Sequence, residues 1–123
     1  MTWQADDEKY IWHPFTQVKT ESKPLVIMHA IDATLISADG STYLDCNSSW
    51  WVNVHGHQVP EIDAAIVAQL QRLDHATFLG STHKPGIELA ELLIDRAPTG
   101  LTRAFFGSDG ASSVEAAIKM AFQ

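Results

Sequence analysis

Residues 105–121 read FFGSDGASSVEAAIKMA, a stretch that joins an apolar run, a small polar turn and the start of a helix. Residues 101–106 have the apolar and aromatic character of a buried strand, and from Val114 onward apolar side chains recur at helical spacing. Gly107 and Gly110 in the turn let the backbone approach a bound group closely. Free N–H groups at a helix start, with the positive end of the helix dipole, bind anions. The stretch therefore predicts a strand, an anion-binding turn and a helix.

The turn has two further interpretations. It matches neither a Walker A loop, nor a dinucleotide-binding fingerprint, nor a nucleophile elbow, so it predicts anion binding without a nucleophile. An ordinary structural turn is an alternative, because every α/β protein contains strand-to-helix turns. Asp109 is also a candidate N-cap, in which case the anion contacts come from main-chain N–H groups and hydroxyls.

Three β-like segments upstream predict a small antiparallel meander. They span residues 25–30, 33–37 and 41–46. Asp39 and Gly40, between the second and third segments, are a strong hairpin signal. The preceding residues 10–24 are expected to be irregular because Pro14 and Pro24 discourage regular structure.

Two helices are predicted between the meander and the turn. Residues 47–54 are expected to be irregular and aromatic, and Pro60 then begins a helix with an apolar stripe. A second helix is predicted over residues 87–96, where Pro98 stops it. Together with a mobile tail over residues 1–9, the pattern indicates an α/β fold.

Composition and charge exclude several classes of protein. The 123 residues are 46% hydrophobic and 19% charged, which is ordinary globular usage. A formal charge of −7 without a Lys/Arg cluster argues against nucleic acid or an anionic membrane as a partner. The one cysteine, Cys46, excludes an internal disulfide and fits a reducing compartment. The first residues do not resemble a secretory signal, so a cytoplasmic location is expected.

Five segments together resemble the class III aminotransferases, which are fold type I enzymes that use pyridoxal 5'-phosphate. They are IWHPFTQ (11–17), SSWW (48–51), HGH (55–57), GSTHKP (80–85) and the turn at 107–115. The first two are similar in particular to the biotin-synthesis branch. That branch transfers the amino group of S-adenosylmethionine to 8-amino-7-oxononanoate and gives 7,8-diaminononanoate.

The resemblance implies an N-terminal fragment of a fold type I transferase. Residues 10–58, with the meander, correspond to part of the small domain, and residues 59–123 begin the large cofactor-binding domain with its first strand-turn-helix. The family's cofactor-bearing lysine and its ring-nitrogen aspartate lie far downstream, and no lysine here has the matching context. We therefore expect no catalytic residue in this chain and a homodimer for the complete protein.

The resemblance also implies the binding residues. For the cofactor phosphate these are Gly110 and Ala111, through their backbone N–H groups, and Ser112. The biotin-branch enzymes commonly have serine where Ala111 stands, so we expect Ser108 or Ser112 to replace that hydroxyl.

For the keto substrate, the residues implied are Trp50, Trp51 and Phe15, with Phe15 standing where some members have tyrosine. Indole faces offer apolar area and an N–H donor to a long-chain substrate. The alternative is that one tryptophan packs in a core and the other lies at an interface, because two adjacent residues on a strand face opposite sides.

A metal site is a further interpretation of the histidines. His55 and His57 form an H-x-H pair, but no third and fourth ligands follow at recognisable spacing, so no metal is expected. Two other functions also stay open: another class III aminotransferase acting on ω-amino acids, and a non-catalytic binding domain that stands alone.

Overall fold

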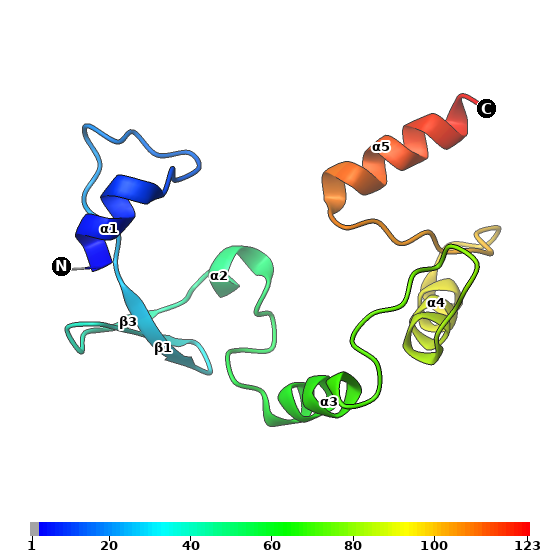
Figure 1. The fold of residues 1–123 in the computed structure, drawn as a ribbon, viewed down its shortest axis with the longest axis horizontal. Helices are drawn as coiled ribbons and strands as arrows, with labels where there is room; N and C mark the ends of the chain where they lie inside the picture. Colours follow the sequence, from blue (N-terminus) through cyan, green and yellow to red (C-terminus); the bar gives the residue numbers. More distant parts are fainter. Residues whose placement is uncertain (1–2) are drawn as a thin grey trace. The chain divides into compact units, whose positions relative to one another are not determined.

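The chain divides into two units in a computed structural model that describes residues 3–123 (Figure 1). The first unit lies within Met1–Arg72 and the second within Leu73–Gln123. The elements of the first unit are α1 (Trp3–Tyr10), β1 (Ile27–Ile31), β2 (Thr34–Ser37), β3 (Thr42–Leu44), α2 (Ser48–Trp51) and α3 (Pro60–Leu70). Those of the second are α4 (Lys84–Arg96) and α5 (Gly110–Ala121). The domain boundary expected between residues 58 and 59 stays a prediction.

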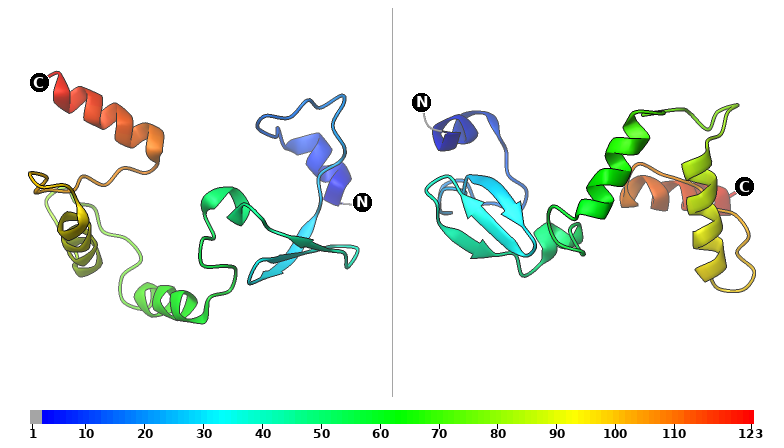
Figure 2. Two further views of the ribbon diagram at one scale, coloured as in Figure 1. Left: turned by 180° about the vertical axis from the view of Figure 1, so that it is seen from behind. Right: turned by 90° about the horizontal axis from the view of Figure 1, so that it is seen from below.

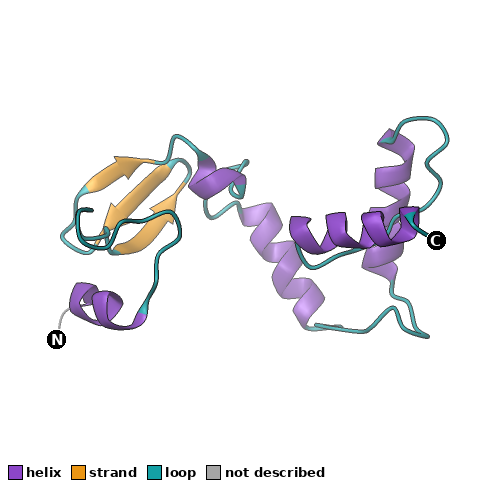
Figure 3. Ribbon diagram, turned by 90° about the horizontal axis from the view of Figure 1, so that it is seen from above, coloured by secondary structure: helices purple, strands orange, loops and turns teal. Residues whose placement is uncertain are grey.

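The predicted antiparallel meander is confirmed, with the strands in the order β1-β2-β3 (Figures 2 and 3). Leu35 of β2 lies opposite Ala30 of β1 on one side and opposite Tyr43 of β3 on the other. The hairpin between β2 and β3 is closed by Asp39, whose Oδ1 accepts from the Ser41 N–H at 2.9 Å and from the Ser37 hydroxyl. These bonds, led by that from Ser37, lower the pKa of Asp39.

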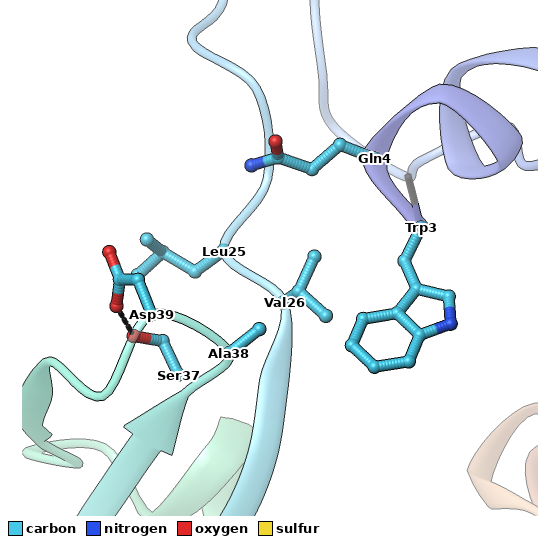
Figure 4. Close-up of a pocket in the computed structure, with 7 residues that line it drawn as sticks. All are labelled: Trp3, Gln4, Leu25, Val26, Ser37, Ala38 and Asp39. Atoms are coloured by element: carbon cyan, nitrogen blue, oxygen red, sulfur yellow. Dashed lines mark hydrogen bonds between the residues drawn. The ribbon is translucent and has the colours of Figure 1, made fainter. Parts of the chain in front are cut away.

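Residues 3–10 form helix α1, within the segment expected to be a mobile tail. Gln4 Nε2 donates to the Pro24 carbonyl at 3.3 Å, and this bond ties α1 to the chain before β1. A shallow pocket lies beside this contact (Figure 4). Its lining residues are Trp3, Gln4, Leu25, Val26, Ser37, Ala38 and Asp39. The expected mobility of the tail stays a prediction.

Both predicted helices are present, and the second begins earlier than expected. α3 begins at Pro60 as predicted. α4 begins at Lys84, three residues before the predicted start, because His83 Nδ1 accepts from the Gly86 N–H at 3.2 Å and caps the first turn. α4 ends at Arg96, before Pro98.

The strand predicted at residues 101–106 is not formed in this structure. The segment precedes α5 without regular structure, although its residues are apolar and aromatic. A strand exists only where a second strand accepts its hydrogen bonds, and among the described residues β1, β2 and β3 pair only with one another. The segment is also not buried, since Leu101, Phe105 and Phe106 are exposed, so the prediction of a buried strand is wrong for this structure.

The described residues contain no buried hydrophobic side chain. The apolar stripe predicted for α3 is not covered by other described residues, since Ile62, Ile66 and Leu70 are all exposed. Ser37 is buried within the meander instead. Across residues 3–123, no helix reaches the length and apolar character that crossing a membrane requires.

Candidate functional site

A left-handed turn carries the two adjacent tryptophans of the first unit. The φ angles of Ser48, Ser49, Trp50 and Trp51 are 53°, 47°, 66° and 71°. Two main-chain bonds close the turn, from the Trp51 N–H to the Asn47 carbonyl (2.8 Å) and from the Val52 N–H to the Ser48 carbonyl (2.9 Å). For residues other than glycine, this left-handed conformation costs roughly 1–2 kcal/mol of conformational free energy each. Contacts elsewhere must therefore offset the strain of α2.

Asp45 supplies those contacts. Its Oδ1 accepts from the Ser49 N–H (2.8 Å), and its Oδ2 accepts from the Ser49 hydroxyl (2.7 Å) and from His57 Nε2 (2.9 Å). The bond from the Ser49 N–H, followed by those from His57 and the Ser49 hydroxyl, lowers the pKa of Asp45 to about 2. Only 5% of the Asp45 side chain and 16% of the His57 side chain are exposed. The carboxylate is therefore ionised and nearly enclosed by its donors.

His57 connects this carboxylate to the end of β1. The His57 N–H donates to the Asp32 carbonyl at 2.8 Å, and the Asp32 N–H donates to the His57 carbonyl at 3.1 Å. Gly56 permits this pairing, because a Cβ built there would lie 3.1 Å from the Asp32 carbonyl oxygen. The segment 55–57 thus precedes α3, as predicted, and it also fixes the neighbouring turn.

The structure brings the three predicted substrate residues together. Phe15 and Trp50 stack with ring centroids 6.3 Å apart and planes at 14°, and Trp50 and Trp51 stack at 5.5 Å and 28°. The three side chains are 97%, 64% and 71% exposed, so none of them belongs to a core. We call these residues, Phe15, Trp50 and Trp51, the aromatic cluster. It presents a continuous apolar surface with free indole edges.

The predicted cofactor residues lie at the start of α5, in the second unit. Asp109 is the N-cap, and its Oδ1 accepts from the Ser112 N–H at 2.7 Å while its Oδ2 accepts from the Ser112 hydroxyl at 2.8 Å. The Ser108 hydroxyl donates to Asp109 Oδ2 at 3.1 Å. These bonds, led by the one from the Ser112 N–H, lower the pKa of Asp109. The N-cap alternative for Asp109 is thus confirmed.

We call Gly110, Ala111 and Ser112, with their N–H groups and the Ser112 hydroxyl, the anion cup. A Cβ built at Gly110 meets no atom within 4 Å, so open space lies beside the first residue of α5. Gly107 differs, because a Cβ there would collide with the Ser113 hydroxyl oxygen. The N–H groups and hydroxyls of the first turn fit a phosphate. The Ser112 donors are held by the Asp109 carboxylate and would be shared with that phosphate.

The histidines do not gather into a metal site. In the described part of the chain, no three His, Cys, Asp or Glu side chains lie where they could hold a metal ion. His57 bonds to Asp45 instead, and the His83 ring packs 4.6 Å from the Phe78 ring.

Sequence reasoning missed Asp45 and His57 as site residues. Asp45 lies in no recognised motif, and the HGH segment does not indicate that His57 contacts Asp45, because these roles depend on contacts 4 and 12 residues away in the chain. The signal in the sequence is that Asp45 and Asn47 come just before the aromatic loop. The side chains of these two residue types commonly accept hydrogen bonds from nearby main-chain N–H groups.

A family model described as aminotransferase class-III matches residues 15–123. The chain therefore belongs to the class-III aminotransferases.

Several relatives make the comparison more particular. The chain is 49% identical over 122 residues to the adenosylmethionine-8-amino-7-oxononanoate aminotransferase of Anoxybacillus flavithermus, covering 98% of this chain and 27% of that protein. It is 50% identical over 119 residues to the enzyme of the same name from Nitratidesulfovibrio vulgaris, covering 95% of this chain and 22% of the relative. The chain thus spans about a quarter of the length of the curated relatives it matches.

Solved structures agree with the fold class. The crystal structure of the adenosylmethionine-8-amino-7-oxononanoate aminotransferase from Methanocaldococcus jannaschii has a TM-score of 0.90 and 45% identity, and the match covers 97% of this chain and 28% of that one. The omega transaminase from Pseudomonas jessenii in complex with PMP has a TM-score of 0.91 at 26% identity, covering 99% of this chain and 28% of that one. The predicted fold type is therefore confirmed.

Proposed function

We propose that the complete enzyme transfers the amino group of S-adenosylmethionine to 8-amino-7-oxononanoate and releases 7,8-diaminononanoate. By complete enzyme we mean a class-III aminotransferase of the relatives' length that carries these 123 residues. The observation that carries the proposal is the 49–50% identity, over nearly the whole chain, to proteins named for this reaction. The aromatic cluster supports it, because three exposed, stacked rings suit a long apolar acid.

The proposed cofactor is pyridoxal 5'-phosphate, which supplies an electron sink for amino-group transfer when it is bound. We assign the phosphate to the anion cup, where Gly110 and Ala111 offer main-chain N–H groups and Ser112 offers its hydroxyl. We propose that the Ser108 hydroxyl, 3.1 Å from the Ser112 hydroxyl, supplies a further donor in place of the serine hydroxyl that Ala111 lacks. These residues bind and orient, and none of them moves a proton in the reaction.

The aromatic cluster is proposed to bind the keto substrate and to exclude water from its chain. Trp50 lies between Phe15 and Trp51 and therefore forms the centre of the surface. Phe15 has no hydroxyl, so its contribution is an apolar contact only. We further propose that the complete enzyme is a cytoplasmic homodimer that needs neither nucleic acid nor a membrane, in keeping with the charge of −7. The assignment of residues 10–58 to a small domain and of 59–123 to a large domain belongs to the same proposal.

A second candidate is amino transfer from an ω-amino acid, supported by the TM-score of 0.91 to the Pseudomonas jessenii transaminase. The lower identity of 26% makes it the weaker candidate. To separate the two, the complete enzyme is incubated with 8-amino-7-oxononanoate and either S-adenosylmethionine or an ω-amino acid, and 7,8-diaminononanoate is measured by mass spectrometry. We expect product with S-adenosylmethionine. Product only with the ω-amino acid would replace the proposed function by the second candidate.

A further inference from the structure

The aromatic cluster depends on a turn that its own residues do not favour. Ser48 to Trp51 all have positive φ angles between 47° and 71°, and none of them is glycine. The side-chain contacts that hold the turn go to the Ser49 N–H and hydroxyl and to the Trp50 N–H, so the conformation of the turn is set from outside the rings. The external contacts converge on Asp45, with a weaker bond from the Trp50 N–H to Asn47 Oδ1 at 3.4 Å.

We propose that Asp45 is a positioning residue that holds the left-handed turn and thereby sets the stacked placement of Trp50 and Trp51. Two of its three bonds go to Ser49, in the middle of the turn, through the N–H and the hydroxyl. The third comes from His57, which is itself paired with Asp32 at the end of β1. One carboxylate therefore links the turn to two other segments of the first unit.

The bonding geometry favours this role over that of an ordinary loop acid. Asp45 lies directly after β3. Its N–H donates to the Ala33 carbonyl at 2.8 Å, so its backbone is fixed to the sheet. Its side chain is only 5% exposed, and the three bonds to it are 2.7–2.9 Å long. Charge-assisted bonds of this length are the stronger class of hydrogen bond. The rigid sheet is thus connected to the strained turn through one side chain.

The effect on substrate rests on the proposed function, because it assumes that the aromatic cluster binds the keto substrate. The effect on the rings does not, since it concerns only their mutual placement. The test therefore has two readouts in the complete enzyme. One is the KM for 8-amino-7-oxononanoate, compared with the rate of the S-adenosylmethionine half-reaction. The other is the circular dichroism of the coupled indoles, isolated as the difference between a protein and its Trp51→Phe counterpart.

In Asp45→Asn the amide no longer accepts at both positions, so the turn relaxes. We expect the indole coupling signal to be lost and the KM for the keto substrate to rise roughly tenfold. The S-adenosylmethionine half-reaction should be unchanged. Asp39→Asn is the matched control, because Asp39 also binds two serines in a turn of the same unit and lies outside the aromatic cluster. It should leave both readouts as in the parent enzyme.

A rescue variant separates positioning from general stability. Ser48→Gly keeps every bond of Asp45 to Ser49 and removes the cost of a positive φ at residue 48, since glycine adopts this conformation freely. Added to Asp45→Asn, it should restore part of the coupling signal and of the KM. A defect of stability alone would lower the unfolding temperature and leave the indole signal of the folded enzyme unchanged.

The outcomes are distinct. An indole signal that is unchanged in Asp45→Asn, or that falls equally in Asp39→Asn, overturns the proposal. A signal lost at unchanged KM supports the positioning role and contradicts the proposed substrate role of the aromatic cluster. If Asp45→Asn does not fold, Ser49→Ala serves instead, because it removes one of the three bonds. A smaller loss of signal is then expected, and no loss overturns the proposal.

Discussion

Trp50 is the residue on which the aromatic cluster depends most. Its ring stacks on both Phe15 and Trp51, so it is shared by the two stacked pairs of the cluster. Truncating the Trp50 side chain therefore leaves a gap in the middle of the aromatic cluster, whereas truncating Phe15 or Trp51 removes only one end of it. This arrangement ranks the three residues for mutagenesis.

Trp50→Ala in the complete enzyme should raise the apparent KM for 8-amino-7-oxononanoate tens-fold and leave cofactor binding nearly intact. The loss of a desolvated aromatic contact typically costs about 2 kcal/mol or more. Steady-state kinetics with the keto substrate varied measure the effect. Trp3→Ala, a partly exposed tryptophan on α1, is the control. Unchanged kinetics in Trp50→Ala would assign this residue to packing.

Gly110→Val should weaken retention of pyridoxal phosphate far more than it lowers the unfolding temperature. A Cβ at residue 110 meets no atom within 4 Å, so the valine side chain should occupy space beside the anion cup without disturbing the turn. Ala111→Ser should tighten the cofactor by roughly 1 kcal/mol, because one more hydroxyl reaches the anion cup. Cofactor dissociation constants measured by absorbance titration test both. An unchanged constant in Gly110→Val at equal stability means that the phosphate binds elsewhere.

Asp109 gives α5 its start, and it places a negative charge beside the anion cup. Its carboxylate accepts hydrogen bonds from both the N–H and the hydroxyl of Ser112, which are also the proposed donors for the phosphate. Asparagine caps a helix about as well as aspartate but carries no charge.

Asp109→Asn should therefore tighten the cofactor about two- to fivefold, because a negative charge beside the phosphate is removed, while the loss of that charge costs the helix start about 0.3–1 kcal/mol. The same titration measures it, with Asp39→Asn as a charge-matched control outside the anion cup. Weaker cofactor binding in Asp109→Asn would show that the carboxylate orients Ser112 for the phosphate instead of competing with it.

The turn α2 should respond to acid through Asp45. The pKa of Asp45 is lowered from 3.8 to about 2 by its hydrogen bonds. A lowered pKa stabilises the folded state above the ordinary value, and that stabilisation disappears as the pH falls through the lowered one. The difference in unfolding temperature between the complete enzyme and Asp45→Asn should thus be constant above about pH 4 and shrink toward pH 2. A difference independent of pH in this range would contradict the assignment.

Local chemistry made several elements predictable, and distant contacts decided the rest. The hairpin at Asp39 and Gly40, the start of α3 at Pro60 and the cap at Asp109 follow from residues within four positions of each other. The handedness of α2 does not, because Ser and Trp do not favour positive φ and the Asp45–His57 contact spans 12 residues.

The stacking of Trp50 on Trp51 likewise departs from the strand geometry considered for adjacent residues. The resemblance identified both tryptophans and Phe15, while the residue that fixes their turn could not be inferred from it. The segment 101–106 failed as a strand for a third reason, since its pairing partner is not among the described strands.

At the scale of the whole chain, the apolar side chains of residues 3–123 do not form a buried core. No hydrophobic side chain among residues 3–123 is buried, and those of α3 are representative. Folding is driven mainly by removal of apolar surface from water, so the described chain gains only part of the largest favourable contribution.

The isolated 123-residue chain should therefore unfold without a cooperative transition and should bind a hydrophobic dye such as ANS strongly. Calorimetry and dye fluorescence measure these properties, with the complete enzyme as the comparison. A sharp calorimetric transition with little dye binding would mean that the isolated chain buries this surface, for instance by self-association, which light scattering detects.

The anchoring of α2 also bears on how this enzyme could acquire new substrates. Asp45 binds the Ser49 backbone and hydroxyl and touches neither indole, so the support of the turn and the chemistry of the surface reside in different residues. Side chains at positions 15, 50 and 51 are thus open to exchange in a library for altered ketone range, while positions 45, 49 and 57 are best left unchanged. Selection can then vary the side chains of the aromatic cluster while the backbone that supports them stays unchanged.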